Sequence, residues 1–122
     1  MKRILIVDDE QDIRDLIKER LMHSNYDVST AENGEDALSK IAAEIPDLIL
    51  LDIAMPKMDG YSMCHKIRHD PKTQDIPVIF FSCKDLEMSG IIERCKKFGN
   101  CGHISKLAPA KELLERIRQV IG

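Results

Sequence analysis

Apolar residues gather in five short runs that alternate with stretches of helical spacing. The runs over residues 4–7 and 48–51 are continuously apolar, as expected of parallel strands that are buried on both faces. This alternation of strand and helix signals is typical of a parallel sheet covered by helices on both faces. The predicted strands cover residues 3–7, 26–31, 47–51, 76–81 and 102–105.

Between the strands, apolar residues recur three and four positions apart, which is the spacing of an amphipathic helix. Asn33-Gly34 predicts a turn, and Pro109 predicts the first turn of the last helix. The predicted helices cover about 11–22, 35–43, 61–68, 86–98 and 109–121. The residues predicted to face the sheet are Ile13, Leu16, Ile17, Leu21, Ala37, Leu38, Ile41, Met63, Cys64, Ile67, Leu113, Leu114, Ile117, Val120 and Ile121.

The 122 residues predict one domain, residues 1–122, because no linker, repeat or low-complexity segment interrupts them. The composition, 43% hydrophobic and 32% charged, is that of a globular protein. The net charge of −3 comes from 21 acidic and 18 basic residues spread along the chain, which disfavours direct nucleic-acid binding. A cytoplasmic location is expected, since neither a membrane span of about 20 apolar residues nor a secretory signal is found.

The four cysteines, Cys64, Cys83, Cys95 and Cys101, lack the paired spacings of a disulfide framework. A core of this size needs no covalent cross-link, and free cysteine packs as a small apolar side chain. We therefore predict four reduced thiols.

Reactive side chains follow four of the five predicted strands. Asp8 and Asp9 come after the first strand, and Asp52 comes after the third. Ser82 and Lys106 come after the fourth and the fifth. The carboxyl ends of parallel strands share one edge of the sheet, where open α/β sheets bind their ligands. We therefore expect these five side chains to lie together.

Three carboxylates held together at a sheet edge repel one another and lose hydration, so the predicted cluster requires a cation. Oxygen ligands completed by water suit Mg²⁺. Beside such an ion, Asp52 is the candidate nucleophile for an aspartyl phosphate. Lys106 and Ser82 are the candidate partners of the phosphoryl oxygens. The residues therefore predict Mg²⁺-dependent phosphoryl transfer.

Simpler interpretations exist for two of these motifs. Asp8 and Asp9 precede a helix, where aspartate often caps free backbone amides. The matching residues at the other strand ends favour the metal and phosphate site over capping. His65 and His69 have the spacing of paired zinc ligands, but without a third ligand an exposed helix face is the preferred interpretation.

With these residues assembled, the chain resembles a response-regulator receiver domain over essentially its whole length. The resemblance implies a flavodoxin-like three-layer sandwich of five parallel strands, in the order 2-1-3-4-5, with five helices. The motifs that carry it are Val7-Asp8-Asp9-Glu10, residues 52–60, Ser82 and Lys106, with weaker support from Asn33-Gly34 and Glu112-Leu113.

The resemblance implies that a histidine kinase or a phosphotransfer protein phosphorylates Asp52. It also implies that Asp9, Asp52 and the backbone carbonyl of Ala54 bind Mg²⁺, with Asp8 acting largely through water. The implied switch has the Ser82 hydroxyl move towards the phosphate and His103, three positions before the lysine, turn inward. An effector protein or domain, or a second copy in a homodimer, then binds the fourth helix, the fifth strand and the fifth helix. Candidate charges on that surface are Lys96, Lys97, Lys111 and Arg118.

Three positions depart from the family pattern. Leu107 stands where a proline in a cis peptide is usual, and a cis Lys106-Leu107 bond would cost about 3 to 4 kcal/mol. We therefore predict a trans peptide and a rearranged loop there. His103 replaces the commoner Tyr or Phe, which makes the implied switch more polar and sensitive to pH near neutrality. Cys83 after Ser82 retains the small size of its position.

Three other functions are compatible with a parallel sheet of this kind. A pseudo-receiver would use the same fold as a constitutive protein-binding module, with weak or no phosphorylation because of Leu107 and the altered pocket. A phosphatase would need a second acid two residues after Asp52, where this chain has Ala54, so turnover on external substrates is not expected. An FMN-binding protein is disfavoured, because the acidic loop after the first strand lacks donors that cradle phosphate.

Overall fold

The computed structural model describes residues 1–52, 60–82, 97, 99, 101–106 and 108–122. Its strands are β1 (Arg3–Val7), β2 (Asp27–Ala31), β3 (Leu48–Asp52), β4 (Val78–Ser82) and β5 (Cys101–Ser105). Its helices are α1 (Gln11–His23), α2 (Gly34–Ala43), α3 (Gly60–Arg68) and α5 (Ala110–Ile121). The predicted helix over 86–98 lies outside the described residues apart from residue 97.

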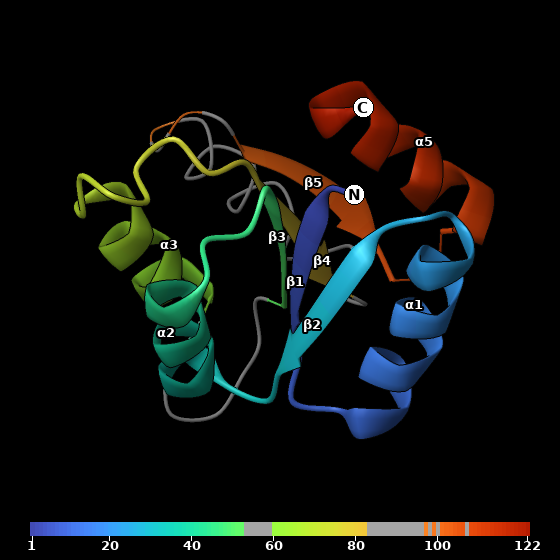
Figure 1. Ribbon diagram of the computed structural model, residues 1–122, viewed down its shortest axis with the longest axis horizontal. Helices are drawn as coiled ribbons and strands as arrows, with labels where there is room; N and C mark the ends of the chain where they lie inside the picture. The colour runs from blue at the N-terminus through green and yellow to red at the C-terminus, as the bar shows by residue number, and fades with distance from the viewer. Residues whose placement is uncertain (53–59, 83–96, 98, 100, 107) are drawn as a thin grey trace.

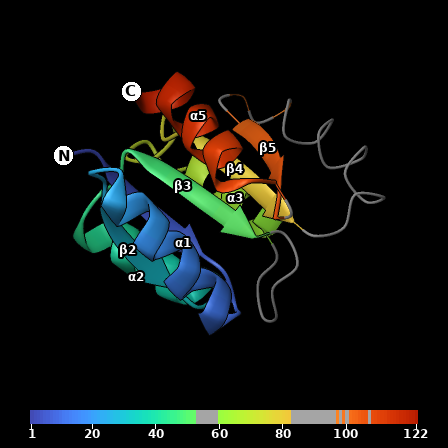
Figure 2. The same ribbon diagram turned by 90° about the vertical axis from the view of Figure 1, so that its right-hand side faces the viewer.

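The five strands form one parallel sheet in the order β2-β1-β3-β4-β5, which confirms the predicted order. In the described part of the chain, α2 and α3 cover one face of the sheet, and α1 and α5 cover the other (Figure 1). The view in Figure 2 has α1 and α5 in front of the strands. This arrangement is the predicted sandwich of helix, sheet and helix layers.

Successive side chains of each strand point to opposite faces, so the sheet divides the core in two. In β3, Ile49 and Leu51 join the cluster beneath α2 and α3, while Leu48 and Leu50 join the cluster beneath α1 and α5. All four side chains are buried completely. The continuous apolar run of β3 is therefore explained by burial on both faces.

Two residues predicted to face the sheet are exposed instead. Leu16 in α1 is 46% exposed and Val120 in α5 is 40% exposed. In each helix the buried stripe follows a spacing of four residues, through Ile17 and Leu21 in α1 and through Leu113 and Ile117 in α5. Leu16 and Val120 lie beside these stripes, so the prediction was wrong for them because it assumed too wide an apolar face.

Helix termini also differ slightly from the prediction. Asn33, predicted as part of a turn, is the N-cap of α2, and its side chain accepts a hydrogen bond of 2.8 Å from the Asp36 amide. Pro109 is the N-cap of α5, one position before the first turn. Such shifts of one or two residues are common at helix ends. None of the described helices is long and apolar enough to cross a membrane.

Candidate functional site

The parallel register aligns the strand ends that carry the predicted site residues. Val7, the residue before Asp8, pairs with Leu51, the residue before Asp52. Ser82 pairs with Ser105, the residue before Lys106. The sheet therefore presents all of these positions at its carboxyl edge, as expected for a ligand site of an open parallel sheet.

Lys106 joins the first and third strand ends through two carboxylates. Its Nζ atom lies 2.7 Å from Oδ2 of Asp8 and 3.3 Å from Oδ2 of Asp52. Asp8 is completely buried, Asp52 is 3% exposed, and the Lys106 side chain is 6% exposed. Two acids remote in sequence thus share one cation in a site that excludes nearly all solvent.

The charge of Lys106 is maintained by its partners. Burial alone would lower the pKa of the ammonium group. The hydrogen bond to Asp8 and the negative charges of Asp52 and Asp8 outweigh that effect and raise the pKa above the ordinary 10.5. The ring of Phe81, whose centroid is 5.2 Å from Nζ, adds a cation–π contact. Lys106 is therefore positively charged throughout the neutral range.

Asp8 is held on several sides. Its Oδ1 atom accepts a 2.9 Å hydrogen bond from the Glu10 amide, while Oδ2 faces Lys106. Its backbone carbonyl accepts a 2.6 Å hydrogen bond from Arg14, and its amide donates to Ala31 at the end of β2. The N-cap of α1 is Glu10, with no capping hydrogen bond from a side chain. Asp8 therefore comes directly after β1 and contacts Lys106, and it is not the N-cap of α1.

Carboxylates at the end of β1 offer a metal site. Ligand oxygens of Asp8, Asp9 and Glu10 lie within 4.8 Å of one another, and within the described residues this is the one such group. Asp9 and Glu10 are exposed, so water can complete a coordination shell, which suits Mg²⁺. The donor set therefore fits the predicted cation. Glu10 was not among the predicted ligands, although it follows the two aspartates directly and shares their chemistry.

The remaining predicted site residues are described only in part. The backbone of Ser82 ends β4, whereas Ala54, Leu107 and the Ser82 side chain lie outside what the structure describes. His103 is half-buried in β5 opposite Phe80. Its carbonyl accepts a 2.7 Å hydrogen bond from Nη1 of Arg116, which ties β5 to α5. The trans peptide and the movements of Ser82 and His103 stay predictions.

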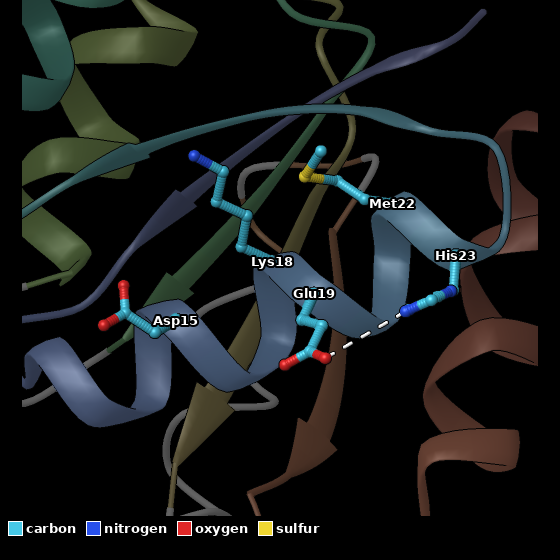
Figure 3. A pocket seen from close by; sticks show the side chains of 5 residues that line it. All are labelled: Asp15, Lys18, Glu19, Met22 and His23. Atoms are coloured by element: carbon cyan, nitrogen blue, oxygen red, sulfur yellow. Dashed lines mark ion pairs between the residues drawn. The ribbon is translucent and has the colours of Figure 1, made fainter.

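A hollow of about 440 Å³ lies over the outer face of α1, away from this site. Figure 3 shows that its lining side chains come from one helix and spread over the surface. Among those drawn there, His23 and Glu19 are paired at 4.0 Å, and both are largely exposed. Such an open face lacks the convergent polar groups of a reactive site.

The histidines and cysteines of the described residues form no metal site. His65 and His69 are exposed, with stacked rings whose centroids are 4.0 Å apart, and none of the described residues joins them as a third ligand. Cys64 is a buried free thiol in the core beneath α3, as predicted. Cys83, Cys95 and the side chain of Cys101 lie outside the described part of the chain.

Comparison with known proteins gives an independent view of this geometry. The family model of the response regulator receiver domain matches residues 4–118. The chain is 38% identical over 122 residues to the probable transcriptional regulator ycf27 of Guillardia theta, covering 98% of this chain and 45% of that protein. It is 35% identical over 120 residues to the alkaline phosphatase synthesis transcriptional regulatory protein PhoP of Bacillus subtilis, covering 98% and 48%. The chain thus spans just under half the length of these relatives.

Solved structures of similar proteins share the fold over nearly the whole chain. The response regulator TrrA of Thermotoga maritima, solved in complex with Mg²⁺ and BeF, is 36% identical with a TM-score of 0.85, covering 98% of this chain and 99% of that one. The chemotaxis protein CheY4 of Vibrio cholerae is 27% identical with a TM-score of 0.89, covering 98% of both chains.

Proposed function

Because this chain belongs to the response regulator receiver domain family, we propose that it is a signalling switch controlled by phosphorylation of Asp52. In this proposal residues 1–122 act as one receiver unit. A histidine kinase or a phosphotransfer protein donates the phosphoryl group. The observation that carries the proposal is the buried contact of Lys106 with both Asp8 and Asp52 at the carboxyl edge of the sheet.

Asp52 is the acceptor because its carboxylate ends the central strand β3 and lies beside a fixed positive charge. One of its oxygens attacks the phosphorus of a phosphohistidine, forming an O–P bond as the N–P bond breaks. The electron pair of that bond leaves with the imidazole of the donor. Lys106 then pairs with a phosphoryl oxygen, which offsets negative charge in a site with little water.

The acids around Asp52 bind the cofactor in this proposal. Asp9, Asp52 and the backbone carbonyl of Ala54 hold Mg²⁺, and Asp8 acts largely through water. Glu10 lies within the same acidic group and adds negative charge near the ion. When bound, Mg²⁺ neutralises phosphoryl oxygens and orients the transferred group. Two observations support this assignment: ligand oxygens of Asp8 and Asp9 lie within 4.8 Å of one another, and Lys106 links Asp8 to Asp52 at the same sheet edge.

The response to phosphorylation is proposed to run through β4 and β5. The Ser82 hydroxyl moves towards the phosphoryl group, and His103 turns inward. Because Arg116 in α5 already binds the His103 carbonyl, a shift of β5 is transmitted to α5. An effector protein or domain, or a second copy of the chain, binds the surface formed by the fourth helix, β5 and α5.

Phosphorylation of Asp52 is tested by intact mass. The protein is incubated with Mg²⁺ and acetyl phosphate, and the proposal expects the mass of one phosphoryl group to be added. Asp52→Asn should abolish the added mass, whereas Asp15→Asn, which changes an exposed acid of α1, should leave it. A wild-type protein that stays unmodified at saturating donor would favour the alternative, a pseudo-receiver that binds its partners constitutively.

A further inference from the structure

A second cavity lies between the C-terminal halves of α2 and α3 and encloses about 260 Å³. Its floor is apolar, formed by the buried side chains of Ile41 and Ile67 and the partly buried Leu38. Ile45, just after α2, stands at its mouth and is 47% exposed. An apolar ligand that covered both Ile45 and the cavity would remove apolar surface from water, which is favourable.

Positive charge borders this cavity on the α3 side. Lys66 and Lys72 line it and are exposed, and within the described part of the chain neither ammonium group forms an ion pair. Oδ1 of the neighbouring Asp70 accepts a 3.0 Å hydrogen bond from the backbone amide of Lys72. These two ammonium groups outnumber the single carboxylate of the lining, which is that of Asp70. They mark a preference for an anionic ligand.

Hydrogen bonds hold the turn after α3, which carries Lys72, before any ligand binds. The hydroxyl of buried Thr73 donates a 2.6 Å hydrogen bond to the Ile67 carbonyl at the cavity floor. The amides of Thr73 and Gln74 donate to the Asp70 carbonyl at 3.0 and 2.9 Å. These bonds fix the turn after α3, so little conformational entropy is lost when the cavity is filled.

The cavity is remote from the candidate phosphorylation site. Each helix follows the carboxyl end of one strand and returns the chain to the amino end of the next, as the parallel order requires (Figure 1). The C-terminal halves of α2 and α3 therefore lie towards the amino edge of the sheet. A ligand bound there does not cover the carboxyl edge of the sheet, where Asp8, Asp52 and Lys106 lie.

We propose that this cavity docks a segment of a partner protein that carries a bulky apolar side chain flanked by carboxylates. The apolar side chain fills the space over Ile41 and Ile67, and the carboxylates pair with Lys66 and Lys72. The volume is below the roughly 300 to 1,000 Å³ of sites for larger small molecules, which favours one side chain as the occupant. Docking is constitutive, because no cavity residue belongs to the phosphorylation site.

Amide NMR shifts provide the test, with a synthetic hexapeptide that has a Leu-Phe pair between acidic residues as the probe. Saturable shifts are expected at Ile45 and across residues 66–73, and equally in Asp52→Asn. A peptide with Ala-Ala at the centre should bind about tenfold more weakly or not at all, because it cannot fill the apolar floor. Shifts that stay linear up to millimolar peptide, or that centre on another face, would overturn the proposal.

Charge reversal supplies the matched control. Lys66→Glu combined with Lys72→Glu should weaken the acidic peptide about tenfold and favour a basic peptide with the same Leu-Phe centre. Lys18→Glu makes a single charge reversal on α1, where Figure 3 shows the side chain, and should leave binding unchanged. Both lysines of the border are exposed, so the fold should persist, which the dispersed amide spectrum verifies. Equal binding of acidic and basic peptides to the wild type would contradict the assigned partner.

Discussion

Replacing Lys106 with Met tests whether the buried carboxylates depend on its charge. At an effective dielectric constant of about 20, unit charges 2.7 and 3.3 Å apart attract by about 6 and 5 kcal/mol. Most of that attraction offsets the desolvation of the charges, and removal of one member of a buried pair typically costs about 3 to 5 kcal/mol. Met keeps much of the apolar stem. We expect Lys106→Met to lower the free energy of unfolding by about 3 kcal/mol at pH 7.

The assay is urea unfolding followed by far-ultraviolet circular dichroism, because the chain has no Trp. EDTA is present so that divalent cations do not replace the lost charge. Adding Asp8→Asn to the Lys106→Met variant should recover part of the loss, since it removes one of the two buried charges. Lys111→Met, whose side chain is 88% exposed, should change stability by less than about 0.5 kcal/mol.

The double variant distinguishes the electrostatic explanation from lost packing. If only packing were lost in Lys106→Met, adding Asp8→Asn would recover none of the stability. A deficit that Asp8→Asn leaves unchanged, or one no larger than that of Lys111→Met, would refute the reasoning.

Further predictions address the other parts of the structure. Because the pKa of Lys106 is raised in the folded state, its stabilising contribution is complete below the unfolded pKa of about 10.4 and is lost as the pH rises through the folded pKa. Urea unfolding between pH 9 and pH 12 or so should therefore show a loss of stability above about pH 10.5 that Lys106→Met lacks. Mg²⁺ should raise the thermal midpoint of the wild type, and more so at higher Mg²⁺ concentration. Asp9→Asn should weaken Mg²⁺ binding by roughly tenfold, as measured by calorimetry. Leu50→Ala should cost about 2 to 5 kcal/mol because Leu50 is fully buried in β3, whereas Val120→Ala should cost less than about 1 kcal/mol in the same urea assay.

Much of the fold was predictable because its signals are local. The apolar runs of β1 and β3 are too continuous for a half-exposed strand, and this alone indicated their central positions. The acids that end them were then expected at one edge of the sheet. Leu16 and Val120 were misplaced because periodicity shows the centre of an apolar face well but its borders poorly.

Other features depend on contacts that a sequence pattern does not contain. The long side chain of Lys106 can reach several partners, and only the packed sheet edge shows that it contacts both Asp8 and Asp52. Glu10 could have been added to the acidic group from its position next to Asp9, had loop geometry been known. The cavity between α2 and α3 arises from the packing of two helices and gave no signal in the sequence.

Chemical trapping identifies the residue that accepts the phosphoryl group. After incubation with Mg²⁺ and acetyl phosphate, borohydride reduces an aspartyl phosphate to homoserine, which marks the acceptor in a peptide map. If Asp52 is the acceptor, homoserine appears at position 52 alone, and none appears in protein that was treated without the donor. Homoserine at Asp8 or Asp9, or unchanged aspartate at all three positions, would contradict the assignment of Asp52 as the acceptor.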